Sequence, residues 1–386
     1  MAITEHEVKD ASQAVEEIAE GRLATEEMIL NVGPQHPSTH GVFRLLATID
    51  GEKLVDADPI IGYMHRGYEK LVEARDYRQI TNLVSRMDWL SNIQNELPLA
   101  LAVESLMEIE VPPRAQYMRV IMCEINRILN HLMFFASFGA ELGAITPTFY
   151  AFREREELQY AMETATGGRL HFGFFRPGGL KEDVPRGFLA QVLSGVRQVI
   201  ARIPDYENLL IGNEIFKERT IDVGVLPKDV AYSYGVTGPI ARGSDIDMDI
   251  RKDEPYLVYD HFDFDVPVGK NGDCFDRFWV LVHEVVESAK IIEQAIEGLP
   301  AGPIIGKVPR VVQAPKGEVY VQTENSLGVL GMYLVSDGDR KPYRLKIRTP
   351  SFSNVSALPY VLKNTYVSDM IAILGSFFFV LGDVDR

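Results

Sequence analysis

Two histidines in the stretch NVGPQHPSTHG, residues 31–41, are of a type and spacing that could do chemistry. Pro34 and Pro37 keep this stretch out of regular helices and central strands, because proline fixes φ and lacks a backbone donor. It is therefore a shaped loop carrying His36 and His40, and histidine can donate or accept a proton near neutral pH. Two interpretations stay open on spacing alone: a functional loop, or a surface turn whose histidines are incidental.

Other candidate sites in the sequence have plain structural explanations. The acidic run at 245–265 lacks the glycine placement and final glutamate of a calcium loop, so it predicts a solvated loop. The glycines between 298 and 306 lead into no GK[ST] motif, which argues against a phosphate loop. His131 and His283 have apolar neighbours in helical stretches and are predicted to be structural. No Ser/His/Asp set and no histidine pair at metal-binding helical spacing emerges.

Composition bounds the class of protein. The chain has 386 residues, 46% of them hydrophobic and 24% charged, which is typical of a soluble protein with a large core. A net charge of −16 argues against a nucleic-acid partner, since phosphate contacts need a basic surface. Cys123 and Cys274 are the two cysteines, which excludes a disulfide scaffold and a CxxC metal site within the chain. The apolar stretch 370–382 is shorter than the ~20 residues of a membrane span.

The pattern of helix-forming and strand-forming segments along the chain predicts an α+β fold. We expect a leader at 1–24, an N-terminal β region at 25–62, a helical bundle at 63–300 with a loop-rich insertion at 219–274, and a C-terminal β region and tail at 301–386. Strands at 26–33, 42–50 and 53–61 should form a small antiparallel sheet, with the histidine loop between the first two. The insertion is expected to contain short strands.

The helical part shows a clear period. One stripe of a long helix after Pro112 and Pro113 is formed by apolar residues at steps of three and four, namely Ile121, Ile125, Ile128, Leu132 and Phe135. The preceding run 87–108 should pair antiparallel with it, and 184–217 and 278–299 supply further helices. Several long helices of this kind pack most simply as a bundle flanked by the sheets.

Several ordered motifs across residues 26–386 carry a family resemblance. They are NVGPQHPSTHGVFRL, IGYMHRGYEKLVEARDYRQ, LGAITPTFYAFREREE, GGLKEDVP, GDCFDRF, PKGEVYVQTE and the ending GDVDR. Together they resemble the D-type subunit of respiratory complex I, the quinone-site subunit of NADH:quinone oxidoreductases. That family is similar in fold to the large subunit of nickel–iron hydrogenases, without the metal. The hydrogenase cysteine positions here hold Asp88, Ser91, Val380 and Asp383, so the ligands for a nickel–iron centre are missing.

The resemblance implies roles for the loop and for two distant residues. His40 is expected to hydrogen-bond the quinone carbonyl and to supply a proton, while His36 supports the loop and lies at the quinone site. Arg66 and His171 match family positions close to an iron–sulfur cluster held by a neighbouring small subunit. Cationic or donor groups there would stabilise the reduced cluster.

Two departures mark the chain as a divergent member of that family. Trp89 stands where the family has a tyrosine on the opposite wall of the quinone site, and indole can donate a hydrogen bond but cannot release its proton near neutral pH. Glu141 stands where the family has an aspartate partner for the loop histidine. As a second catalytic group, it is expected to orient His40 and to raise its pKa.

The resemblance implies a peripheral subunit of a proton-translocating complex on the cytoplasmic side of a bacterial cell membrane. Its partners would be the cluster-carrying small subunit, other hydrophilic-arm subunits and a membrane-arm subunit at the quinone entry. Quinone would be the substrate and NAD(H) would react elsewhere in the complex. Two alternatives stay open: a scaffold subunit that has lost quinone chemistry, and a related complex fed by ferredoxin or another donor.

Overall fold

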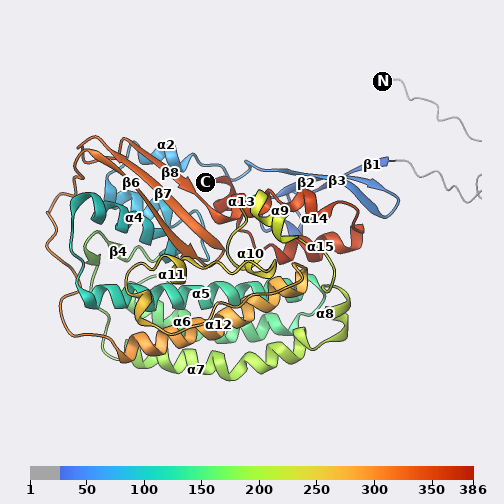
Figure 1. The fold of residues 1–386 in the computed structure, drawn as a ribbon. Helices are drawn as coiled ribbons and strands as arrows, with labels where there is room; N and C mark the ends of the chain where they lie inside the picture. Colours follow the sequence, from blue (N-terminus) through green and yellow to red (C-terminus); the bar gives the residue numbers. More distant parts are fainter. Residues whose placement is uncertain (1–26) are drawn as a thin grey trace, which may run out of the picture.

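A three-stranded sheet opens the described part of the chain, residues 27–386 of this computed structural model. Strands β1 (Glu27–Val32), β2 (Arg44–Asp50) and β3 (Lys53–Ile60) pair antiparallel in that order. Alternate residues of β2 are buried, as expected for a strand with one face on a core. The predicted N-terminal sheet is therefore confirmed, and it projects at the right of Figure 1. The predicted leader at 1–24 lies outside the described residues.

Four long helices form the bundle below the C-terminal sheet in Figure 1. They are α5 (Pro113–Glu141), α6 (Thr146–Thr166), α7 (Phe188–Tyr206) and α12 (Cys274–Glu297). Helix α5 packs between α6 and α12, and every residue of the stripe predicted from its period is fully buried. The helical bundle expected from the sequence is thus confirmed.

Helix α4 (Asn92–Met107) runs antiparallel to α5, as predicted. The amide of Gln94 donates to the Cys123 carbonyl over 2.9 Å, and Arg119 forms an ion pair with Glu104 at 2.5 Å. Residues later in α4 therefore contact residues earlier in α5, which is the antiparallel order. These polar links between buried faces fix the relative register of the two helices.

The C-terminal sheet lies against α4. Its strands β6 (Gly317–Asn325), β7 (Gly328–Ser336) and β8 (Arg344–Arg348) pair antiparallel in sequence order. Four helices that the sequence reasoning did not anticipate follow: α13 (Pro350–Val355), α14 (Leu358–Leu362), α15 (Val367–Ser376) and α16 (Leu381–Asp385). They carry the chain back to the N-terminal sheet, where the Leu54 N–H donates to the Thr365 carbonyl over 2.8 Å.

The insertion at 219–274 contains short helices rather than strands, so the prediction of short strands there is wrong. Here lie α9 (Lys228–Ser233), α10 (Pro239–Gly243), α11 (Ile250–Asp253) and a 3-10 turn at Tyr259–His261. Asp249 caps α11 by accepting from the Arg251 N–H, and such local bonds compete with strand pairing.

The remaining elements are short. They are a 3-10 turn at Pro37–Thr39, α2 (Tyr68–Val72), α3 (Tyr77–Val84), the hairpin strands β4 (Phe175–Arg176) and β5 (Gly179–Leu180), a π-helical turn at Glu207–Ile211 and α8 (Glu214–Glu218). Within residues 27–386, no helix combines the length and apolar character needed to cross a bilayer.

Buried charges join the bundle to the C-terminal sheet. This interior charge cluster consists of Glu124, Arg127, His131, Arg242, Asp249, Arg251, Glu284 and Glu324, all almost fully buried. Arg242 lies 2.6 Å from Glu284 and 2.9 Å from Glu324, and Arg251 lies 3.0 Å from Glu124. Because buried charges need partners, the cluster depends on all of its contributing segments being in place.

Candidate active site

A single 3-10 turn at Pro37–Thr39 shapes the loop between β1 and β2. His36 caps it, because its Nδ1 accepts a hydrogen bond from the Ser38 N–H over 3.3 Å. The hydroxyl of Thr39, a fully buried residue, donates to the carbonyls of Pro34 (3.1 Å) and His36 (2.7 Å). The loop is thus held by its own polar groups, and the structure places His36 in a supporting position.

His40 follows the turn in a left-handed conformation, with φ 49° and ψ 33°. Its ring stacks on Phe379, with ring centroids 4.4 Å apart, and its side chain is 10% exposed. The ring Nε2 lies 3.8 Å from Oε1 of Glu141, at the end of α5. A Cβ at Gly375 on α15 would overlap Glu141 Oε2, so this glycine makes room for the carboxyl group.

The structure brings His40, Glu141 and Trp89 to one cavity of about 160 Å³. Its walls also include Leu90, Met133, Phe134, Ser137, Phe379 and Val380. An apolar cavity of about 150 Å³ can take up benzene, so this space matches a single six-membered ring. Predominantly apolar walls with a few converging polar groups are typical of small-molecule sites.

Burial sets the protonation of the His40–Glu141 pair. Desolvation lowers the pKa of His40 to about 4, although a hydrogen bond with the Phe379 backbone opposes the shift. Desolvation likewise raises the pKa of Glu141 to about 8. At neutral pH, His40 is therefore neutral and Glu141 carries a proton. The expectation that Glu141 raises the pKa of His40 is wrong, because the dry surroundings disfavour both charged forms.

Geometry also assigns the His40 tautomer. Within residues 27–386, Nε2 of His40 and Oε2 of Glu141 are buried without a hydrogen-bond partner. The bond with the Phe379 backbone must then be made by Nδ1, and a carbonyl only accepts, so Nδ1 carries the hydrogen. Nε2 is left as an acceptor facing the protonated carboxyl.

Trp89 forms one wall from the turn between α3 and α4, and its side chain is 38% exposed. The preceding carboxylate, Asp88, is fully buried and organises this turn. Its Oδ1 accepts from the backbone N–H groups of Leu90 (2.8 Å) and Ser91 (3.2 Å). The Trp89 carbonyl accepts from the Asn92 amide over 3.0 Å. The turn therefore presents the indole from a fixed backbone.

Arg66 and His171 lie outside the cavity lining but converge on the start of the same turn. The Arg66 guanidinium lies 5.5 Å from the Tyr68 ring centroid, and the Tyr68 hydroxyl donates to the Arg86 carbonyl over 3.2 Å. Nδ1 of His171 lies 3.0 Å from the Ser85 carbonyl. Burial lowers the pKa of His171, and the charge of Arg86 adds to this.

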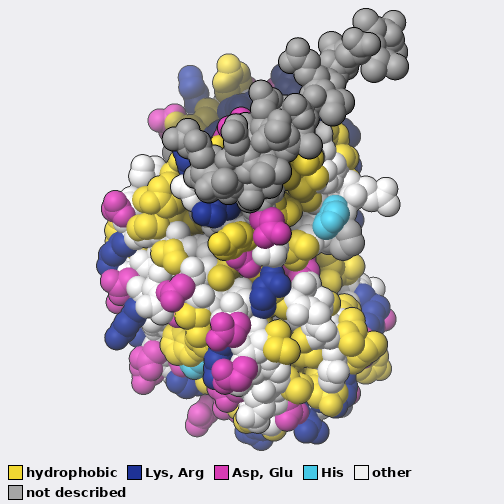
Figure 2. All heavy atoms as spheres, turned by 90° about the vertical axis from the view of Figure 1, so that its right-hand side faces the viewer, with side chains coloured by type: hydrophobic (Ala, Val, Ile, Leu, Met, Phe, Trp, Pro, Cys, Tyr) yellow, Lys and Arg dark blue, Asp and Glu magenta, His cyan; other side chains and the backbone are white. Residues whose placement is uncertain are grey.

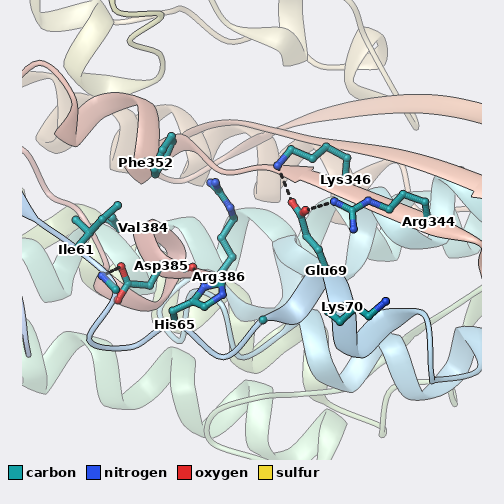
Figure 3. Close-up of a pocket in the computed structure, with 12 residues that line it drawn as sticks. Ile61, His65, Glu69, Lys70, Arg344, Lys346, Phe352, Val384, Asp385 and Arg386 are labelled. Carbon is teal, nitrogen blue, oxygen red and sulfur yellow. Dashed lines mark hydrogen bonds and ion pairs between the residues drawn. The ribbon is translucent and has the colours of Figure 1, made fainter.

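A second, open hollow of about 520 Å³ lies beside the loop at residues 61–67, which carries Arg66 (Figure 3). Asp385 of α16 holds this loop, since its carboxylate accepts from the backbone N–H groups of Gly62 (2.7 Å) and Met64 (2.6 Å). The lining residues labelled in Figure 3 include the cations Lys70, Arg344, Lys346 and Arg386. Glu69 pairs with Arg344 and Lys346, and Lys70 pairs with Glu73.

The four positions matching hydrogenase cysteines lie on two segments that touch. A Cβ at Gly382 would lie 2.6 Å from the Met87 carbonyl, so the start of α16 packs directly on the turn that carries Trp89. Within residues 27–386, no group of three or more His, Cys, Asp or Glu side chains is arranged to hold a metal ion.

Several wall residues were missed by sequence reasoning. Met133, Phe134 and Ser137 lie one to two turns before Glu141 on the same helix, and this spacing could have revealed them. Phe379 gave no signal, because its contact with His40 depends on the tertiary fold. Arg86, in the motif RMDWLS, is a further basic group that the sequence did not single out, and its charge acts on His171.

Comparisons with known proteins identify the family of the chain. A family model described as the respiratory-chain NADH dehydrogenase 49 Kd subunit matches residues 141–313 and 307–386. A D-type subunit of the NADH-quinone oxidoreductase of Streptomyces griseus subsp. griseus is 53% identical over 371 residues, covering 95% of this chain and 94% of the relative. The D-type subunit of the NADH-quinone oxidoreductase of Geobacillus thermodenitrificans is 50% identical over 364 residues, covering 94% of this chain and 100% of the relative. The chain therefore belongs to the family of the 49 kDa, or D-type, subunit of respiratory-chain NADH dehydrogenase, which is part of an oxidoreductase complex.

Proposed function

We propose that this chain forms the quinone-reduction site of a proton-translocating NADH:quinone oxidoreductase. One observation carries the proposal: His40 and Glu141, from segments far apart in sequence, direct unpartnered polar atoms to a ring-sized cavity. A quinone headgroup is a six-membered ring with carbonyl acceptors. It fits the size of this space, and the protonated Glu141 carboxyl offers its carbonyls a hydrogen-bond donor.

The chemistry follows from the protonation state of the pair. Reduction of a quinone to a quinol takes two electrons and two protons, one proton for each carbonyl oxygen. The electrons would arrive one at a time from an iron–sulfur cluster in a neighbouring subunit. Glu141 holds a proton at neutral pH, and Nε2 of His40 can accept it and pass it to a carbonyl oxygen. The pair supplies one proton, and its components return to their resting state when Glu141 is reprotonated.

The surfaces beside the cavity support this placement in a complex. His171 contacts the turn that carries Arg86, and Arg66 lies over Tyr68, whose hydroxyl bonds the same turn. Positive or donor groups there would stabilise a reduced cluster in the small subunit. Figure 2 shows the end of the molecule with the N-terminal sheet, where apolar side chains lie among acidic and basic ones. Phe149 and Ile215 are 66% and 70% exposed. Such groups would be covered by other subunits of the hydrophilic arm and by a membrane-arm subunit.

As part of this proposal, the chain lies at the periphery of the membrane complex, on the cytoplasmic side of a bacterial cell membrane. NADH would be oxidised by other subunits, and quinone would reach the cavity through the membrane-arm contact. The chain itself would contribute the site and its proton-handling groups.

The test compares quinone reduction by the purified complex carrying the native chain or His40→Ala. Electron transfer from NADH to a water-soluble artificial acceptor reports on the upstream clusters and serves as the control. We expect His40→Ala to lower quinone reduction by roughly 100-fold or more while the artificial acceptor is reduced normally. A native complex that reduces the artificial acceptor but no quinone would identify a scaffold instead. If reduced ferredoxin supports quinone reduction and NADH does not, the donor assignment is wrong.

A further inference from the structure

Two buried carboxyl groups behind the cavity wall have no role in the scheme above. Asp88 precedes the wall residues Trp89 and Leu90, and Asp383 lies one turn after the wall residue Val380. Both carboxyl groups are fully buried. Their segments touch, as the close approach of the Gly382 backbone to the Met87 carbonyl shows.

Each carboxyl group has one oxygen engaged and one oxygen free. Asp88 Oδ1 accepts two backbone N–H groups, and Asp383 Oδ2 accepts the Ser351 N–H over 2.9 Å. Asp88 Oδ2 and Asp383 Oδ1 are buried without a hydrogen-bond partner in the described part of the chain. Leaving two ionised carboxylates like this is unfavourable, whereas a proton held by one of them removes a charge and supplies a donor.

Nearby cations do not neutralise the pair directly. Arg386 and Arg348 are the basic groups that face Asp383, from the residue that follows α16 and from β8. Arg386 donates to the Thr349 hydroxyl, and Arg348 donates to the carbonyls of Val329 and Gly235. Across residues 27–386, neither Asp88 nor Asp383 forms an ion pair within 4.0 Å.

We propose that Asp88 and Asp383 share one proton and act as a second proton reserve for the quinone site. This inference rests on the proposed function and completes its proton balance. The His40–Glu141 pair gives one proton to one carbonyl oxygen, and the Asp88–Asp383 pair provides the proton for the other. Each C=O π bond becomes a C–O–H group, with both electrons coming from the neighbouring cluster. Asp88 and Asp383 lie behind the wall and are proton-holding rather than catalytic residues.

Electrostatics support the sharing. Burial raises the pKa of Asp88 to about 6. Burial, together with the negative charge of Asp88, raises the pKa of Asp383 to about 7. Two interacting carboxyl groups lose their protons in separate steps that belong to the pair. One proton is thus retained toward neutral pH, where Trp89 cannot supply one.

The test uses the purified complex with Asp88→Asn and, separately, Asp383→Asn. An asparagine Oδ1 can keep the backbone hydrogen bonds of either aspartate, so the turn and α16 retain their anchors, but it cannot release a proton. We expect each variant to lower kcat for quinone reduction by roughly 100-fold with little change in KM. In the native complex, kcat for quinone reduction should fall as pH rises from about 6 to 7, and this fall should be absent in both variants. Reduction of the artificial acceptor should be unchanged.

Infrared difference spectra of the oxidised and reduced complex provide a readout independent of turnover. The protonated carboxyl C=O signal that responds to reduction should contain a component from Glu141 and one from the aspartate pair, and both asparagine variants should lose the second component while keeping the first. Native pH profiles and an unchanged C=O signal with both components in both variants would overturn the shared-proton proposal while leaving the quinone site in place. Normal quinone reduction by His40→Ala, in contrast, would overturn the proposed function itself.

Discussion

His40 Nε2 and Glu141 Oε1 lie 3.8 Å apart, too far for a hydrogen bond and close enough for a small movement to create one. Since burial lowers the pKa of His40 and raises that of Glu141, the neutral pair has its proton on the carboxyl group. In the proposed mechanism, the histidine is therefore the relay and the glutamate is the store. The family resemblance, in contrast, made His40 the proton source and Glu141 the group that orients it.

Quinone reduction should lose activity as pH rises through about 8. Burial raises the pKa of Glu141 to about 8, so its proton is retained in the folded chain below that pH and is lost as pH rises through it. Glu141→Gln should be slow at every pH and lack this limb. Initial rates from pH 6 to 9.5, divided by the artificial-acceptor rates, measure the effect.

Glu141→Asp is the matched variant for that series, because it keeps a protonatable group. We expect it to retain an alkaline limb, with a lower rate because the shorter side chain lies farther from His40. A limb near pH 8 that persists in Glu141→Gln would show that another group supplies this proton.

Trp89 should bind the substrate without serving as a proton source. Trp89→Phe removes the indole donor, and the loss of about 1 kcal/mol of hydrogen bonding should raise the quinone KM roughly fivefold. Trp89→Tyr restores a donor that can also release a proton, so kcat should be equal to or above that of the native chain. Steady-state kinetics at several quinone concentrations separate the two effects. An unchanged KM in Trp89→Phe would mean that the indole does not contact the substrate.

Gly375→Ala should displace Glu141. The added methyl group would overlap Oε2 and come within 2.9 Å of the Phe138 ring, so the carboxyl group must move away from His40. We expect reduced quinone turnover and a stability loss of about 1–3 kcal/mol from overpacking. Gly195→Ala on α7, whose Cβ would lie 2.8 Å from Leu158, is the matched control. It should affect thermal stability but leave quinone turnover intact; equal turnover losses would point to a general packing effect.

The interior charge cluster should be sensitive to the loss of a single partner. Burial alone would raise the pKa of Glu284, but Arg242 and His131 hold it at about 2. Because the pKa of this carboxyl group is lower in the folded chain than in the unfolded chain, Glu284 stabilises the fold above the ordinary glutamate pKa. This stabilisation is lost as pH falls from about 4.5 toward 2. Glu284→Gln should cost about 3–5 kcal/mol near neutral pH, because it leaves Arg242 incompletely paired.

Thermal unfolding of this subunit within the complex measures that cost. Glu293 on the same helix pairs with Arg197 at an exposed position, and Glu293→Gln should change stability by less than about 0.5 kcal/mol. Similar losses for both variants would contradict the importance of burial.

His36 should matter through the loop alone. His36→Ala removes the acceptor for the Ser38 N–H and should cost about 1 kcal/mol, whereas His36→Asn can keep a capping acceptor. The quinone KM should therefore rise in His36→Ala, which loses the cap, and stay near the native value in His36→Asn, which keeps it. A large KM change in both variants would indicate direct contact with the substrate.

Local sequence patterns predicted the helices and strands better than they predicted the tertiary environment of individual side chains. The stripe of α5 was readable because its period reports which face is buried, and the three N-terminal strands were bounded by clear turns. The stacking of His40 on Phe379 was not readable, since no local pattern joins residues so far apart. The direction of the His40 pKa shift failed for the same reason: it depends on how completely α5, α15 and the turn at Trp89 exclude water.

The interior charge cluster has a consequence for the order of folding. Its members come from α5, the insertion at 219–274, α12 and β6, so closing the loops between them costs entropy before the last partners meet. Until then, hydration is more favourable for each charge than an incomplete interior pairing. We therefore expect these side chains to stay in water through early collapse and to enter the core together in a late step. A compact chain with a misplaced segment would keep an unpaired charge and remain free to reopen.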